Sequence, residues 1–85
     1  MRNVIVTGGS RGIGLAIASR LAGSGDYNVL AVARRESEEF RRAARGGGED
    51  RLHFRAFDLG EIGKISVFVK EVRDTFGTIY GLINN

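Results

Sequence analysis

The chain has 85 residues, which allow one small domain and exclude a two-domain enzyme with a cleft between its halves. Hydrophobic residues make up 42% and charged residues 27%, as in ordinary globular proteins, so a disordered chain and a coiled coil are excluded. It contains no cysteine, one histidine and no apolar run of the ~20 residues that span a bilayer. We therefore expect a cytoplasmic protein that binds neither a metal ion nor a membrane.

The net charge of +3 is unevenly distributed along the chain. Residues 1–45 contain eight arginines and four acidic residues, whereas acidic residues slightly outnumber basic ones in residues 46–85. The planar guanidinium group of arginine suits phosphate. We expect the first half of the chain to bind an anion.

The first predicted element is a strand at Val4–Val6, because a short, continuous, β-branched run is typical of a strand buried on both faces. Thr7–Gly12 follows at once and reads as a tight turn. A helix that packs closely on the sheet is predicted next, because Ile13, Ile17 and Leu21 form one stripe. Ala16, Ala18 and Ala22 are interleaved with this stripe. The glycine-rich residues 23–26 should end this helix.

Val29–Val32 is the second predicted strand, and a crossover of this length implies a parallel, right-handed βαβ unit. Glu36–Arg45 is polar and predicts a short solvated helix, which should end in a loop at Gly46–Asp50. Leu52–Phe57 alternates apolar and polar residues, so we expect an edge strand that is buried on one side.

Glu61–Phe76 predicts an amphipathic helix closed by Gly77, and Ile79–Ile83 predicts a fourth strand. The core face of this helix should carry Ile62, Ile65, Val69, Val72 and Phe76. The order β-α-β-α-β-α-β indicates an α/β fold, a Rossmann-type doubly wound parallel sheet with strand order 3-2-1-4, spanning residues 1–85 as one domain. Because the fourth strand would leave an apolar edge bare, we expect further strands to follow it in the complete protein.

A glycine-rich loop lies between the first strand and its helix, where such a loop is informative. Gly8 permits the tight turn, Gly12 lets a pyrophosphate approach the backbone, and Gly14 lets the helix lie close to the strand. Free N–H groups at the helix N-terminus would face the anion. The predicted phosphate site comprises Gly8, Ser10, Arg11, Gly12, Ile13 and Gly14. The alternative is a glycine-rich turn that serves packing alone.

Three segments resemble motifs of the short-chain dehydrogenase/reductase family. Thr7–Gly14 is similar to its T-G-x-x-x-G-x-G motif, Asp58-Leu59 resembles its adenine-pocket motif, and Asn84-Asn85 resembles the opening of its N-N-A-G motif. The resemblance implies a nicotinamide-dependent oxidoreductase of small-molecule carbonyl or hydroxyl substrates, a homo-oligomer when complete, in which this chain supplies the cofactor site. In general likeness it resembles the 3-oxoacyl carrier-protein reductases.

The choice between NADP and NAD should depend on the end of the second strand, where an acidic residue would bind the ribose 2′-hydroxyl of NAD. Ala33 occupies this position and is followed by Arg34 and Arg35, while Arg11 can add a third positive charge. NADP is therefore favoured over NAD. The alternative is that Arg34 and Arg35 belong to a solvated basic face together with the arginines of the next helix.

The resemblance also implies roles for three residues after the later strands. Asp58 would accept a hydrogen bond from the adenine amino group, with the backbone of Leu59 alongside. Alternatively, Asp58 is an ordinary helix-entry residue. Asn84 would brace the fourth strand and the ribose region.

The family's proton donor is a tyrosine four residues before a lysine. Tyr27 is followed at that distance by Ala31, and Tyr80 by Asn84. We therefore expect no catalytic residue in these 85 residues and no dehydrogenase activity from them alone.

Two other functions remain in competition. One is a non-catalytic NADP-binding or sensing module. The other is a nucleic-acid binder that uses the clustered arginines, but the sequence offers no aromatic platform or groove-reading helix for it. We expect no nucleic-acid partner.

Overall fold

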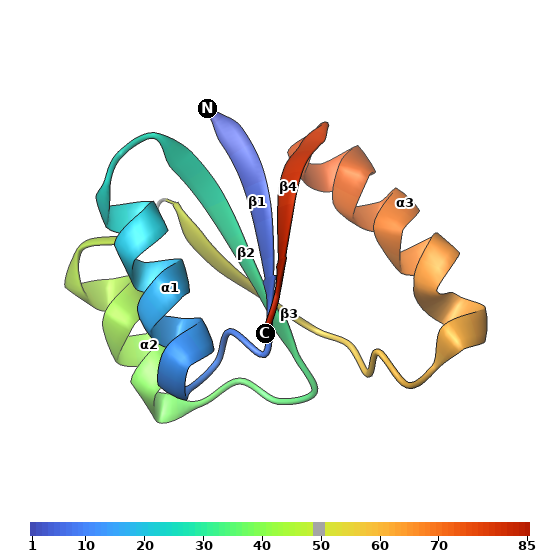
Figure 1. Cartoon of the computed structure of the whole chain (residues 1–85), viewed down its shortest axis with the longest axis horizontal. Helices are drawn as coiled ribbons and strands as arrows, with labels where there is room; N and C mark the ends of the chain where they lie inside the picture. Colours follow the sequence, from blue (N-terminus) through green and yellow to red (C-terminus); the bar gives the residue numbers. More distant parts are fainter. Residues whose placement is uncertain (49–50) are drawn as a thin grey trace.

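The computed structural model describes residues 1–48 and 51–85. The strands are β1 (Arg2–Thr7), β2 (Tyr27–Ala33), β3 (Leu52–Ala56) and β4 (Ile79–Asn84). The helices are α1 (Gly12–Gly23), α2 (Glu38–Ala43) and α3 (Ile65–Phe76). All strand pairs are parallel in the order β3-β2-β1-β4, with α1 and α2 on one face of the sheet and α3 on the other (Figure 1). The predicted doubly wound fold and strand order are confirmed.

The α1 face of the sheet is closely packed. The helix residues buried there are Gly14, Ala18 and Ala22, and both alanines are fully buried. The predicted stripe is wrong at Ile13, which is 74% exposed, whereas Ile17 and Leu21 are half-buried and pack against the core. Small side chains allow the helix to lie close to the valines of the sheet, so the larger residues lie at the margin of the contact.

The α3 face is filled by large side chains and is less completely buried. Val72 is the buried residue of α3, and the aromatic rings of Phe57, Phe68 and Phe76 lie beside it half-buried. Ile62, predicted to face this core, is 79% exposed. This prediction is wrong because residues 62–64 form a 3-10 turn that precedes α3.

The segment after β2 differs in detail from the prediction. The helix is shorter than expected and begins after Ser37, whose hydroxyl accepts a hydrogen bond from the Phe40 N–H at 3.0 Å. A π-helical turn at Ala44–Gly48 replaces the start of the predicted loop. The rest of that loop, residues 49–50, lies outside the described residues.

The third strand is the sheet edge, as predicted, but side chains cover both of its faces. The ring centroid of Phe54 lies 5.5 Å from that of Phe40, and the ring of His53 lies 5.1 Å from that of Phe76. His53 Nε2 also bonds to Asn28 Oδ1 at 2.8 Å. The expectation of one-sided burial is therefore wrong at His53, which is half-buried against Phe76, whereas Leu52 is buried and Arg55 exposed as expected.

Among the described residues, no helix is both long and apolar enough to cross a bilayer.

Candidate functional site

The glycine loop joins β1 to α1 at the carboxyl end of the sheet. Gly8 has a φ of +64° and Gly12 a φ of +58°, a conformation that glycine adopts at no steric cost. The Gly8 N–H donates to the Val32 carbonyl at 2.8 Å, which fixes the loop against β2. A Cβ on Gly14 would lie 2.2 Å from the Gly8 oxygen. The predicted close approach at Gly14 is thus real, although its partner is the loop carbonyl and not the strand.

The first turn of α1 has backbone donors available for an anion. Arg11, the residue before the helix, is extended, and its side chain makes no capping hydrogen bond. The first N–H groups of a helix have no acceptor within it, and they carry the positive end of the helix dipole. Space is open beside Gly12, where a Cβ would meet no atom within 4 Å. This turn can therefore receive a phosphate directly on its backbone.

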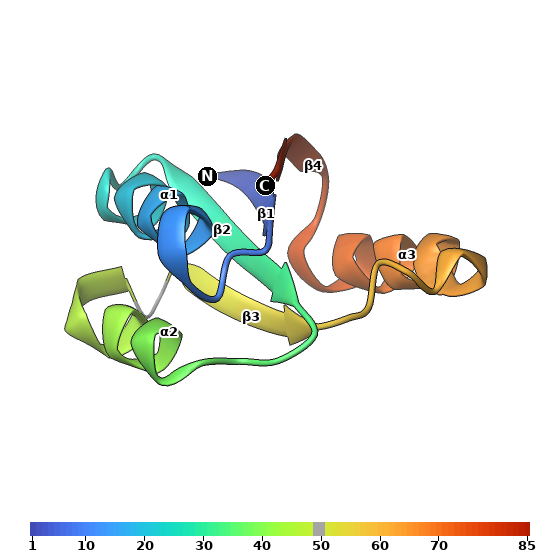
Figure 2. The ribbon, with the colours of Figure 1, turned by 60° about the horizontal axis from the view of Figure 1, so that its bottom comes forward.

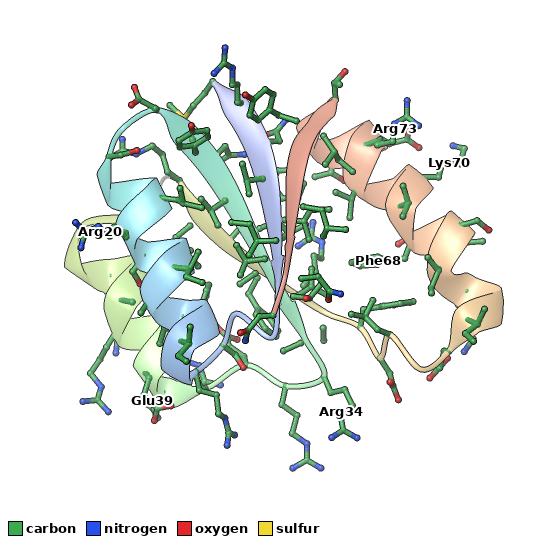
Figure 3. The ribbon with its side chains drawn as sticks, viewed as in Figure 1. Arg20, Arg34, Glu39, Phe68, Lys70 and Arg73 are labelled. Carbon is green, nitrogen blue, oxygen red and sulfur yellow. The ribbon has the colours of Figure 1, made fainter. Side chains whose placement is uncertain are left out.

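An open pocket of about 530 Å³ lies between the glycine loop and the segment that follows β2. It is lined by Gly8, Ser10 and Arg11 from the first wall and by Ala33, Arg34 and Arg35 from the second. Figure 3 shows Arg34 extending from the end of β2 into solvent. Throughout residues 1–48 and 51–85, none of the three arginines forms an ion pair with the protein.

At least one arginine of α2 forms ion pairs with acidic side chains, unlike the arginines of the pocket. Arg41 Nη1 lies 2.9 Å from Glu38 Oε1, and Arg41 Nε lies 3.8 Å from Glu36 Oε1. Its charge is therefore offset locally. The uncompensated positive charge beside the glycine loop belongs to the pocket arginines.

The carboxyl ends of β1 and β4 are tied together by side chains. Thr7 Oγ1 donates to Asn84 Oδ1 at 2.9 Å and accepts from the Asn85 N–H at 3.0 Å. Asn85 Nδ2 donates to the Gly8 carbonyl at 3.4 Å. Asn84 thus braces the strand end, and Thr7 and Asn85 join it in doing so.

Asp58 lies two residues beyond the end of β3, beside a second pocket of about 380 Å³. Arg34 lines this pocket as well as the first, so the two are neighbours. Asp58 Oδ1 accepts the Gly60 N–H at 2.8 Å, which is a local turn contact and not the helix-entry role weighed as the alternative, since Glu61 is the residue that precedes the 3-10 turn. Lys64 also lines the pocket, and its hydrogen bond and charge interaction with Glu61 raise its pKa.

The predicted site residues are thus brought to one end of the sheet with two qualifications. Ile13 points its side chain into solvent, so only its backbone can serve an anion. Leu59 is 43% exposed and lines neither of these pockets.

Sequence reasoning missed two further residues that shape the loop. A Cβ on Gly9 would lie 2.8 Å from the Ala31 Cβ, so this glycine lets the loop rest on β2. The buried Ser37 hydroxyl donates to the carbonyl of Ser10, a residue that lines the pocket. The only sequence signal for Ser37 was its place before two glutamates, which is typical of a helix N-cap.

A family model described as short chain dehydrogenase matches residues 2–85. A short-chain dehydrogenase, anuI, from Penicillium roqueforti is 33% identical over 84 residues, covering 96% of this chain and 33% of that protein. The 3-oxoacyl-acyl-carrier-protein reductase FabG of Staphylococcus aureus is 33% identical over 87 residues, covering 99% of this chain and 35% of that protein. The latter supports the predicted likeness to these reductases.

Among solved structures, the Cj0485 dehydrogenase matches with a TM-score of 0.86 and 29% identity, covering 99% of this chain and 32% of that one. The chain spans about a third of the length of these proteins. Because the family match covers nearly every residue and the glycine loop, sheet order and strand-end asparagines agree with it, the chain belongs to the short-chain dehydrogenase family.

Proposed function

We propose that this chain is the NADP-binding domain of an oxidoreductase acting on a carbonyl or hydroxyl group of a small-molecule substrate. The observation that carries the preference for NADP is the pocket in which Arg11, Arg34 and Arg35 meet the glycine loop. No carboxylate stands at Ala33 to bind the 2′-hydroxyl of NAD or to repel a 2′-phosphate. The cofactor, when bound, supplies or accepts the hydride.

The residues present fit this cofactor. The first turn of α1 would hold the pyrophosphate on its free N–H groups, beside the open space at Gly12. Arg11 and Arg34 would hold the 2′-phosphate, with Arg35 on the same wall. Asp58 uses Oδ1 in its hydrogen bond to the Gly60 N–H. Its other carboxylate oxygen would accept a hydrogen bond from the adenine amino group, next to Arg34.

The expected preference can be estimated from the chemistry of the contacts. A charge-assisted hydrogen bond is worth roughly 1.5–3 kcal/mol when well formed. The guanidinium groups here are solvated, so two of them should contribute about 2 kcal/mol together, which is about thirtyfold in affinity. This is enough to separate NADP from NAD.

A non-catalytic NADP-binding module is the second candidate, since the pocket described above accounts for cofactor binding and neither tyrosine of residues 1–85 has a lysine four residues on to serve proton transfer. Catalysis needs a proton donor positioned at the carbonyl oxygen. We expect residues 1–85 alone to oxidise no NADPH. In the natural protein, saturable NADPH binding without oxidation by any of a panel of ketones would favour the module.

The test of the proposal is the substitution Arg34→Asp, with Arg42→Asp as the matched control. Both change the charge equally, but Arg42 is an exposed residue of α2 that does not line the pocket. A carboxylate at position 34 would repel the 2′-phosphate, so NADP affinity should fall by at least about 30-fold and NAD affinity by less than about threefold. Arg42→Asp should change both affinities little. If Arg34→Asp lowers the affinities for NADP and NAD equally, the proposal is overturned.

A further inference from the structure

One buried hydroxyl connects the two walls of the arginine pocket. Ser37 is 7% exposed and precedes α2. Its Oγ donates to the Ser10 carbonyl, 27 residues earlier in the chain, and accepts from the Phe40 N–H at 3.0 Å. A serine hydroxyl has one proton to donate, and this one is used to bridge two separate segments.

The bridge lies where it can control the shape of the pocket. Ser10 and Arg11 form one wall, while Ser37 continues the wall that carries Arg34 and Arg35. A second tie, from the Gly8 N–H to the Val32 carbonyl at 2.8 Å, joins the same walls at the sheet. The walls are therefore held together both at the end of β2 and at the start of α2.

Each pocket arginine lies, along the chain, between residues that form these two hydrogen bonds or next to one of them. Arg11 directly follows Ser10, and Arg34 and Arg35 lie between Val32 and Ser37. All three side chains are exposed and make no ion pair with a described residue, so their own contacts do not fix their separation. The backbone that carries them must do so.

We propose that Ser37 is a positioning residue for 2′-phosphate recognition, whose hydroxyl holds the Arg11 wall against the Arg34 wall so that one phosphate can meet both. This inference rests on the proposed NADP function. It adds the residue that would position the arginines on which the selectivity for NADP depends. Pyrophosphate binding depends on the first turn of α1 and should not need Ser37, because the Gly8 N–H separately bonds the loop before this turn to β2.

The role of Ser37 as a helix cap can be separated from its role as a bridge. Capping α2 needs only an acceptor for the Phe40 N–H, whereas the bridge needs a donor to the Ser10 carbonyl. Glycine at an N-cap position costs a helix only a few tenths of a kcal/mol relative to serine. Ser37→Gly therefore removes the bridge and largely keeps the helix, and Ser37→Thr keeps both functions.

The experiment compares 2′,5′-ADP with 5′-AMP, which differ only in the 2′-phosphate, by titration calorimetry on the natural protein and its Ser37 variants. Ser37→Ala and Ser37→Gly should each bind 2′,5′-ADP about five- to tenfold more weakly, the loss expected for one misplaced charge-assisted contact. Binding of 5′-AMP should change by less than about twofold, since it uses no 2′-phosphate contact. Ser37→Thr should restore the wild-type values.

The outcomes separate this inference from the function on which it rests. If the wild-type protein binds both nucleotides equally, NADP recognition itself is refuted, and the role of Ser37 with it. If the wild type prefers 2′,5′-ADP and Ser37→Gly keeps that preference, only the role of Ser37 is refuted. If Ser37→Gly loses affinity for both nucleotides to the same extent, Ser37 has a general structural role, and its proposed role in 2′-phosphate recognition is refuted. Should Ser37→Ala fail to fold, the glycine and threonine variants decide.

Discussion

The two faces of the sheet differ in the size of the side chains that pack on them and in how completely these are buried. On the α1 face, Ala18 and Ala22 are fully buried, and the larger residues Leu15, Ile17 and Leu21 are partly buried against the same core. On the α3 face, Val72 is 3% exposed, but Val67 of the same helix is 58% exposed and the aromatic residues are half-buried. Figure 2 shows α1 and α2 gathered on one side of the strands and α3 standing on the other.

We relate this difference to the roles of the two faces, of which one carries the proposed binding site and the other stabilises the sheet. The close face carries the glycine loop, whose atoms would have to meet a phosphate within hydrogen-bonding distance in the function that we propose. The α3 face gives the sheet its second cover: Phe68 points toward the sheet, while Lys70 and Arg73 point away (Figure 3). Changes on the first face should therefore affect binding, whereas changes on the second should affect stability alone.

The largest effect is expected from Gly14→Ala. Its Cβ would lie 2.2 Å from the Gly8 oxygen, and a backbone carbonyl on a fixed loop cannot yield cheaply. We expect a loss of about 3 kcal/mol in unfolding free energy and no measurable binding of NADP or NAD. Gly23→Ala, in the same helix with no atom within 4 Å, is the control and should bind normally. Near-normal binding by Gly14→Ala would refute the importance of this close approach.

Gly12→Val should separate binding from stability. A Cβ at this position would meet no protein atom within 4 Å, so the fold should lose only about 1–2 kcal/mol for the left-handed backbone. The valine side chain would fill the space of the pyrophosphate, so both cofactors should lose about 100-fold or more in affinity. Chemical denaturation and cofactor titration measure the two effects. Affinities within a few fold of wild type would place the nucleotide elsewhere.

On the other face, Val72→Ala should lower the unfolding free energy by about 2 kcal/mol by leaving a cavity in the α3 core. The ratio of NADP to NAD affinity should not change. Val67→Ala, exposed on the same helix, should cost less than about 0.5 kcal/mol. A changed cofactor ratio in Val72→Ala would show that the two faces are coupled.

The smallest effect is expected from Lys70→Gln. Lys70 Nζ lies 2.8 Å from Asp74 Oδ2, but both side chains are largely exposed, at 76% and 65%. Solvent-screened pairs four residues apart in a helix contribute about 0.3–0.5 kcal/mol. Urea denaturation at low salt should detect at most this change, and a loss above about 1 kcal/mol would mean that α3 depends on more than its apolar face.

The sequence was sufficient for the order and type of the strands and helices, because buried strands, helix periodicity and glycine turns are local signals. It was wrong about Ile13, which is exposed, whereas Ile17 and Leu21 of the same stripe are partly buried against the core. Ile13 begins one stripe at four-residue spacing and Gly14 begins the next, and periodicity alone ranks the larger residues as buried. Only the approach of the helix to β2 decides that the smaller stripe lies inside.

The site was predictable to the same extent. The loop glycines and the pocket arginines lie at motif spacings that the sequence displays, whereas the contacts of Ser37 and Asn85 join residues far apart in the chain. Ser37 meets the loop 27 positions earlier, and Asn85 meets Gly8 77 positions earlier. No local pattern encodes such pairs, because the sheet topology alone brings them together.

The most direct test of the central claim is the affinity of the unmodified natural protein for NADPH and for NADH, each titrated at low and at higher salt. If the arginine pocket binds the 2′-phosphate, NADPH should bind about thirtyfold more tightly at low salt, and the gap should narrow as salt screens the exposed guanidinium groups. Equal affinities, or tighter binding of NADH, would contradict the account.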